Sequence, residues 1–222
     1  MTTTLEQPSL APPVSPLREL LTLAAPTVLQ MASYTLMQFA DTYMLALFSE
    51  QVGSKSAEPN AAANAGLFTF ALMSLGWGTI QIVNALVSQS FGRGERQACG
   101  RYLWQGIWFA VIYGLAILPI LPFARVPFAF FGHEPALVEL QGVYLQITVS
   151  WSIFRLIGAA FSQFLLAINR PNLVLVAALL GVSVNVLFNW LLIFGNAGFP
   201  RLGLAGAAWG TNLAVLAETG AL

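Results

Sequence analysis

Charged residues are scarce in this chain. Asp, Glu, Lys and Arg together make up 8% of its 222 residues, whereas 57% of the residues are hydrophobic. Ordinary globular domains carry about 25% charged residues, so this composition indicates a polytopic membrane protein. Nine basic and nine acidic residues give a formal net charge of zero, which argues against a nucleic-acid partner.

Cysteine and histidine are also nearly absent. Cys99 is the single cysteine, so no internal disulfide can form, and the single histidine, His133, falls between two predicted helices. The sequence contains no HExxH, GxSxG or phosphate-loop motif. Because hydrolytic chemistry has no recognisable centre here, we expect neither an enzyme nor a bound cofactor.

Long apolar segments dominate the rest of the chain. A membrane-spanning helix needs about 20 predominantly apolar residues. We expect six such helices, at about 20–48, 64–91, 102–123, 137–168, 173–194 and 204–222. Lipid offers no partner for free backbone groups, so these segments predict an all-α integral membrane bundle over residues 17–222. Residues 1–16 are rich in Pro and Thr, lack the pattern of a signal peptide, and are expected to form a disordered tail.

The basic residues predict the orientation of this bundle. If the N-terminus is cytoplasmic, the inner segments hold five arginines and the outer loops hold three basic residues. The inner set is Arg18, Arg93, Arg96, Arg101 and Arg170, and the outer set is Lys55, Arg125 and Arg201. This bias favours a cytoplasmic N-terminus in a multi-pass protein of the cell membrane.

The first predicted helix carries one acid and a polar stripe. At 100° per residue, one narrow arc contains Thr27, Gln30, Tyr34, Gln38 and Asp41. An ionised acid at a helix centre costs about 3 kcal/mol on insertion scales, so Asp41 is expected to face protein or water, or to take up a proton. We interpret the stripe as the lining of a polar cavity. The alternative is that Asp41 lies at the membrane surface.

Polar side chains also follow one face of three later helices. The second helix carries Ser74, Gln81, Asn84 and Ser88, the fifth carries Asn185 and Asn189 one turn apart, and the sixth carries Thr211 and Glu218. Their amide, hydroxyl and carboxylate oxygens are hard ligands that suit Na⁺ or a proton-linked water. Alternatively, the asparagines only hydrogen-bond helices together, for about 0.6 kcal/mol each. The sixth helix also contains GAAWG, a GxxxG pattern at 206–210 that predicts close helix packing.

Arg155 is the unusual residue of the fourth helix, because it falls in the middle of an apolar segment. A buried arginine needs a partner or water. It is expected either to pair with Asp41 across the bundle or to bind an anionic group. The alternative is that its long side chain reaches the membrane interface.

Several of these segments resemble a known transporter family. LAAPTVLQ followed by FADTYM looks like the first helix of multidrug and toxic compound extrusion (MATE) transporters. NALVSQSFGRGE resembles the second helix and the loop after it, and the stretch from INRPN to GLAGAAWGT resembles the region from the fourth helix to the sixth. The resemblance covers nearly everything from residue 17 to residue 222.

The resemblance implies both an architecture and an activity. Members of this family look like two six-helix lobes, about twice the length of this chain, that export cationic and often aromatic compounds against Na⁺ or H⁺. This chain then corresponds to the N-terminal lobe. By the same resemblance Asp41 is the coupling-ion site, and Asn185 and Thr211 are further ligands. Asn189 stands where some relatives have a second acid, which is a departure from the pattern.

The same resemblance implies a small cationic organic substrate, surrounding membrane lipid, and a second six-helix lobe or a second copy of the chain. We expect Tyr34, Gln38, Gln81, Asn84 and Arg155 to line the substrate cavity, although Arg155 matches no feature of the family. One alternative is an exporter that flips lipid-linked oligosaccharides, although such a cavity would need several cationic residues and only Arg155 qualifies. The other alternative is a truncated half with no transport of its own.

Overall fold

The computed structural model of the chain describes residues 16–54 and 57–222. These residues form helices and loops, without a strand among them. The elements are α1 (Pro16–Val52), α2 (Ala57–Gly92), α3 (Arg96–Ile117), the 3₁₀ helix η1 (Leu118–Phe123), α4 (Val126–Phe130), α5 (Pro135–Ser150), α6 (Ser152–Ala167), α7 (Pro171–Phe194), the 3₁₀ helix η2 (Asn196–Gly198) and α8 (Leu204–Ala221). The tail expected at 1–16 lies, apart from Pro16, outside the described residues.

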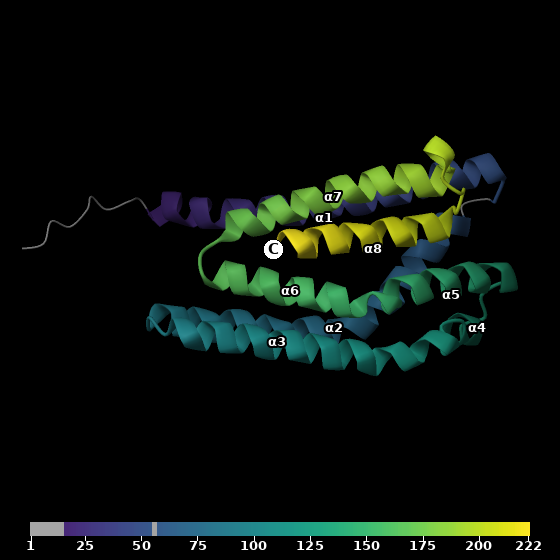
Figure 1. Ribbon diagram of the computed structural model, residues 1–222. Helices are drawn as coiled ribbons and strands as arrows, with labels where there is room; N and C mark the ends of the chain where they lie inside the picture. Colours follow the sequence, from purple (N-terminus) through teal and green to yellow (C-terminus); the bar gives the residue numbers. More distant parts are fainter. Residues whose placement is uncertain (1–15, 55–56) are drawn as a thin grey trace, which may run out of the picture.

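The long helices lie side by side along one common axis (Figure 1). They form two groups of three, in which α1 and α8 pack against α7, and α2, α3 and α6 pack against one another. Helix α5 joins the two groups because it contacts both α2 and α8. Helices α1 and α7 run antiparallel to α8 (Figure 1). This arrangement brings the polar faces of α1, α7 and α8 together.

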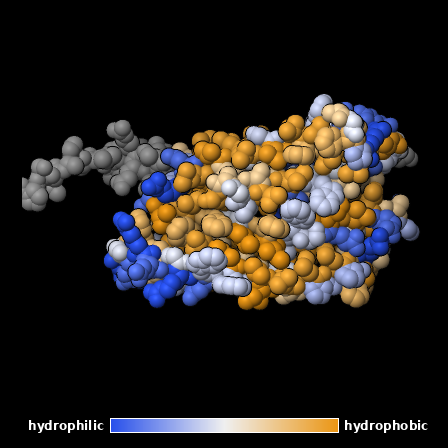
Figure 2. Space-filling view, viewed as in Figure 1, coloured by the Kyte–Doolittle hydropathy of each residue, from blue (hydrophilic) through white to orange (hydrophobic). Residues whose placement is uncertain are grey.

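The exterior of the bundle is apolar. Figure 2 shows a broad hydrophobic band with hydrophilic residues gathered at both ends of the molecule. Large side chains such as Phe39, Trp108 and Val176 are 68%, 62% and 64% exposed. A water-soluble protein rarely exposes so continuous an apolar surface, and lipid is the solvent that suits it. The predicted all-α membrane protein is therefore confirmed.

Length and apolarity identify most of the spans. Helix α2, helix α3 together with η1, and helix α7 are each long and apolar enough to cross a bilayer, and α5 and α6 qualify as a bent pair. Helices α1 and α8 are not in that set, and they are the helices that carry Asp41, Thr211 and Glu218. Six spans remain a prediction, with α1 and α8 as the two that contain the polar face.

The fourth predicted helix is not continuous. A single helix was expected over 137–168, but α5 ends and α6 begins on either side of Trp151, and the two axes differ by 49°. The buried Asn212 side chain of α8 supplies one reason, because its Nδ2 donates to the carbonyl of Ile147 at 2.8 Å. A donor from another helix thus satisfies a carbonyl in the last turn of α5, where the regular ladder stops.

The end of helix α3 follows from its prolines. Helix α3 tightens into η1, which contains Pro122, and the two prolines at 119 and 122 lack the N–H that would continue an α-helix.

Helices α7 and α8 pack closely at Gly206 of α8, where an added Cβ would lie 2.6 Å from the backbone carbonyl of Leu192. Only glycine permits this approach of α8 to α7, so the close packing predicted from the GxxxG pattern is confirmed.

Candidate cation site

Three helices contribute to one polar cluster inside the apolar bundle. Helix α1 supplies Asp41, α7 supplies Asn185 and Asn189, and α8 supplies Thr211. The two asparagines share a face because they are four residues apart on one helix. Helix α7 packs between α1 and α8, so this face meets Asp41 on one side and Thr211 on the other.

The cluster is a continuous chain of hydrogen bonds. Asn189 Nδ2 donates to Asp41 Oδ1 at 2.5 Å and to Asn185 Oδ1 at 3.2 Å. Asn185 Nδ2 in turn donates to Thr211 Oγ1 at 3.4 Å. The Thr211 hydroxyl donates to the backbone carbonyl of Ala207 at 2.9 Å. Asn185 and Asn189 are fully buried and Asp41 is partly buried.

These contacts leave oxygen atoms free for a cation. Both donors of the Asn189 amide are engaged, but its Oδ1 is buried without a hydrogen-bond donor. That oxygen, the Asp41 carboxylate and the Thr211 hydroxyl are the hard ligands that Na⁺ prefers, and Asp41 can instead take a proton. Within the described ranges no three His, Cys, Asp or Glu side chains gather, so the donor set does not suit a transition metal.

The residues expected to line a substrate cavity do not join the hydrogen-bonded cluster of Asp41. The Tyr34 hydroxyl donates to the carboxylate of Glu218, and Gln30 Nε2 donates to the Tyr34 oxygen at 3.4 Å. Gln38 and Gln81 are exposed on the outside of the lobe. Asn84 Nδ2 donates to the backbone carbonyl of residue 163 at 3.1 Å, so that side chain joins α2 to α6.

Arg155 does not pair with Asp41. Its Nη2 donates to Asn212 Oδ1 at 3.0 Å, while its Nε is buried without a partner. Asn212 thereby bridges α8 to both sides of the break between α5 and α6. Asn212 was missed in the sequence, although a single amide directly after Thr211 in an apolar helix was the available signal. The ion pairs of the described chain lie in the connections and at their edges, at Arg93–Glu95 and Arg125–Glu139.

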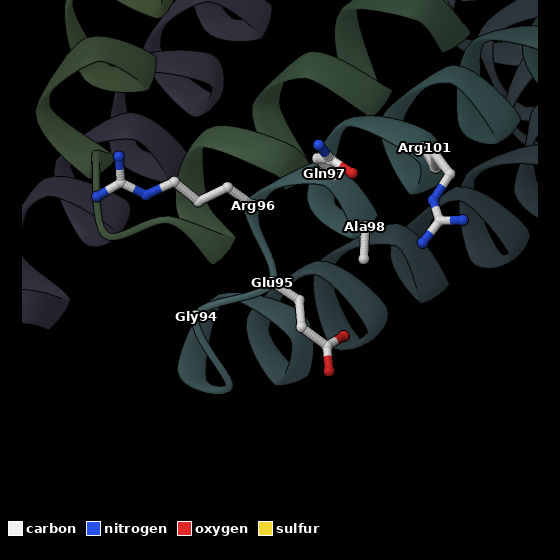
Figure 3. A pocket seen from close by; sticks show the side chains of 6 residues that line it. All are labelled: Gly94, Glu95, Arg96, Gln97, Ala98 and Arg101. Atoms are coloured by element: carbon white, nitrogen blue, oxygen red, sulfur yellow. The ribbon is translucent and has the colours of Figure 1, made fainter.

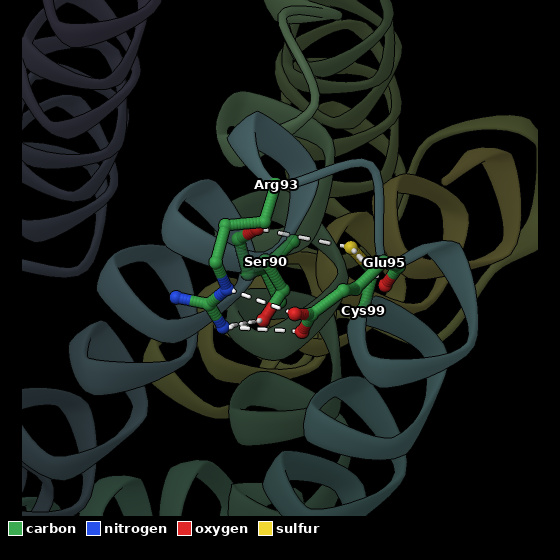
Figure 4. Close-up of polar contacts among 5 residues, drawn as sticks. Ser90, Arg93, Glu95 and Cys99 are labelled. Atoms are coloured by element: carbon green, nitrogen blue, oxygen red, sulfur yellow. Dashed lines mark hydrogen bonds and ion pairs between the residues drawn. The ribbon is translucent and has the colours of Figure 1, made fainter.

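The connection between α2 and α3 is polar but separate from the cluster. A hollow of about 420 Å³ is lined by residues 94–98 and Arg101, with the side chains of Arg96 and Arg101 on opposite sides (Figure 3). Arg93 Nε donates to Glu95 Oε1 at 3.0 Å, and Arg93 also contacts Ser90 (Figure 4). The adjacent Arg93 guanidinium lowers the pKa of Glu95. Both side chains of this ion pair are exposed, so the pair lies on the surface of the protein.

Comparison with known proteins bears directly on this fold and cluster. A family model described as MatE matches residues 26–191, a range that holds Asp41, Asn185 and Asn189. The chain belongs to the MatE family. The resemblance to multidrug and toxic compound extrusion transporters is therefore confirmed.

Relatives of the MatE family match the sequence of this chain over most of its length. A probable multidrug resistance protein NorM of Mesorhizobium japonicum is 30% identical over 200 residues, which cover 89% of this chain and 41% of that protein. The multidrug resistance protein PmpM of Pseudomonas aeruginosa is 30% identical over 208 residues, covering 88% and 40%. The chain thus spans less than half the length of these relatives.

A solved MatE-type structure supports the fold. A crystal structure of MATE in the straight conformation matches with a TM-score of 0.78 at 18% identity, covering 89% of this chain and 42% of that one. At this identity the likeness shows the architecture alone. Helix α1 of the present structure runs without interruption through Pro26.

Proposed function

We propose that this chain supplies the N-terminal lobe of a cation-coupled antiporter. The antiporter exports small cationic, often aromatic, compounds across the cell membrane, with the N-terminus of the chain in the cytoplasm. The observation that supports this proposal is the bond between Asn189 of α7 and Asp41 of α1, inside an otherwise apolar bundle. This hydrogen bond joins an ionisable group on α1 to a fully buried amide on α7, so a change of charge at Asp41 changes its strength.

The coupling follows from the chemistry of this contact. A hydrogen bond to a carboxylate is about twice as strong as a neutral one, so protonation of Asp41 weakens its hold on Asn189. A Na⁺ ion bound by the oxygens of Asp41, Asn185, Asn189 and Thr211 competes for the same carboxylate. Either cation loosens α1 from α7 and removes the charge that attracts a cationic substrate. The two conformations then differ in cation affinity, which is the condition for coupling.

The substrate is proposed to bind next to this cluster. Tyr34 offers an aromatic face within the same lobe, and Gln38, Gln81 and Asn84 offer amide groups on α1 and α2. Gln38 and Gln81 are exposed in the isolated lobe, which suits residues that face a cavity between two lobes. Arg155 is proposed to border that cavity near the break between α5 and α6.

A second lobe completes the proposed transporter, because the relatives are more than twice as long as this chain. It comes either from another six-helix segment or from a second copy of this chain. Two copies related by an axis along the membrane normal keep the same orientation, so a dimer of lobes satisfies the geometry.

Energised efflux of ethidium from cells that express this chain tests the proposal. Asp41→Asn keeps the size of the side chain and removes the ionisable group, so we expect export to fall to the level of cells without the protein. Glu139→Gln is the matched control, because Glu139 is an exposed acid paired with Arg125 and lies outside the cluster. Membrane insertion is compared by quantifying each variant in isolated membranes.

Two results contradict parts of the proposal. Unchanged efflux in Asp41→Asn would remove Asp41 from the coupling mechanism. Efflux that is absent from the wild-type chain, although the chain is inserted, would exclude a self-sufficient dimer and leave a separately encoded second lobe as the partner to co-express.

A further inference from the structure

A second polar layer lies one step along the bundle from the Asp41 cluster. Tyr34 is seven residues before Asp41 on α1, and Glu218 is seven residues after Thr211 on α8. Seven helical residues rise about 10 Å. Because α1 and α8 are antiparallel, both steps lead in the same direction (Figure 1). Tyr34 and Glu218 therefore form a layer of their own, about 10 Å from the first.

The same three helices build this second layer. The Tyr34 hydroxyl of α1 donates to Glu218 Oε1 of α8. Helix α7 contributes Gly181, where an added Cβ would lie 3.2 Å from Glu218 Cβ and 3.3 Å from Glu218 Oε2. The glycine brings the backbone of α7 against the carboxylate, so the space for Glu218 is closely defined on that side.

Glu218 is partly buried, and its level in the bundle follows from its contact with α7. Its neighbour Gly181 is the eleventh of the 24 residues of α7, whereas Asn189 is the nineteenth. The level of Gly181 is thus near the middle of that span, where a charged side chain costs most. An acid at this depth calls for a compensating cation or a proton.

The described structure supplies no positive charge to Glu218. No basic group of the described chain lies within 4.0 Å of its carboxylate, and the polar side chains facing it are Tyr34 and, behind the tyrosine, Gln30. Helix α7 presents Gly181. On α6, the basic residue is Arg155, which is bonded to Asn212, six residues or about 9 Å earlier on α8. One phenol hydroxyl therefore donates to an otherwise uncompensated carboxylate.

We propose that Glu218, together with Tyr34, forms a second binding site for a coupling cation, either a proton or Na⁺, in the same lobe as Asp41. This inference rests on the proposed function only in assigning the bound cation a role in antiport. The binding itself follows from the contacts around the carboxylate. When the cation binds, the hydrogen bond from the Tyr34 hydroxyl to Glu218 weakens or breaks, and the contact between α1 and α8 loosens at this level. Cation binding at Asp41 loosens the contact between α1 and α7 in the same way. Helix α1 is thus held at two levels by two ionisable groups.

Infrared difference spectroscopy of the purified chain in lipid nanodiscs tests the site without any transport. The C=O stretch of a protonated carboxylic acid is followed as pH is raised, with and without Na⁺, in wild type, Asp41→Asn, Glu218→Gln and the double variant. We expect two buried carboxylic acid signals in the wild type, loss of a different one in each single variant, and loss of both in the double variant. Glu139→Gln, at the exposed pair, leaves both signals in place.

Tyr34→Phe keeps the carboxyl group and removes its donor, so the Glu218 signal remains but shifts in frequency. It also covers the case in which Glu218→Gln fails to fold. Disappearance of the Glu218 signal on adding Na⁺ at constant pH identifies Na⁺ as a ligand, and a response to pH alone identifies the proton. A Glu218 signal that ignores both pH and Na⁺, or that changes only with ethidium, overturns the proposal. Because no transport is measured, a failed efflux experiment leaves this result interpretable.

Discussion

Gly210→Ala tests whether the Asp41 cluster depends on the close packing of α7 and α8. Gly210 directly precedes Thr211, and a Cβ added there would lie 2.1 Å from Asn189 Oδ1 and 3.2 Å from the backbone nitrogen of Asn189. The side-chain amide must rotate away from the new methyl group, while the nearby backbone prevents α8 from accommodating it freely. Rotation moves Asn189 Nδ2 away from Asp41.

The magnitude follows from three opposing effects. Overpacking costs about 1–3 kcal/mol, and losing a hydrogen bond to a charged group costs about 1.5–3 kcal/mol. Replacing a helical glycine with alanine returns about 1 kcal/mol. We therefore expect a net loss of about 1.5–5 kcal/mol in the free energy of unfolding. The expected fall in melting temperature is at least about 3 °C for a chain of this size.

Thermal unfolding of the purified variants in detergent measures this effect. Gly66→Ala is the matched control, since Gly66 also lies in a helix and nothing lies within 4 Å of its added Cβ. It should unfold at or above the wild-type temperature. Gly206→Ala should be the most damaging of the three, because its Cβ meets the backbone of α7. Gly210→Ala that is as stable as Gly66→Ala, with the Asp41 infrared signal unchanged, would refute the reasoning.

Two further changes probe other parts of the lobe. Asn212→Ala leaves the Arg155 guanidinium without its acceptor and should destabilise the protein by about 1.5–3 kcal/mol, and Arg155→Met should recover part of that loss in the double variant, as a thermal double-mutant cycle would show. Arg93 lowers the pKa of Glu95, so the stabilisation from this pair is present above the usual pKa of glutamate and disappears as pH falls through the lowered value. Glu95→Gln should therefore lower the melting temperature slightly at neutral pH and not at all in acid or high salt, and a drop that persists in acid would contradict this assignment.

Helical periodicity predicted which polar residues share a face of one helix, and the resemblance to MATE transporters grouped Asp41 with Asn185 and Thr211. Helical periodicity puts Asn185 and Asn189 on one face and marks Asp41 as an acid that apolar neighbours do not stabilise, and the structure brings these three residues together with Thr211. The pattern works because a polar stripe on a membrane helix has few surroundings that satisfy it. The glycine spacing at 206–210 predicted close packing for a similar reason, since only small residues let two backbones approach.

Contacts between distant residues were not accessible from the sequence. The expected partner of Arg155 was Asp41, but its acceptor is Asn212, 57 residues further along the chain. The same asparagine bonds to the last turn of α5 beside the break at Trp151, and no proline or glycine lies close to that residue in the sequence, since Gly142 and Gly158 are 9 and 7 residues away. Periodicity also put Tyr34 and Gln38 on one arc of α1, yet Tyr34 contacts Glu218 while Gln38 is exposed. The packing angle of the neighbouring helices decides which part of a stripe is buried.

Cation release upon substrate binding tests the central claim most directly. Ethidium is added to the purified chain in lightly buffered nanodiscs, and the pH of the medium and the concentration of free Na⁺ are recorded for the wild type and for Asp41→Asn. If the exported cation and the coupling cation compete for Asp41, the wild type releases H⁺ or Na⁺ as ethidium binds, and Asp41→Asn releases less or none. Equal release from the two proteins, or ethidium binding to the wild type with no release, would contradict antiport through Asp41.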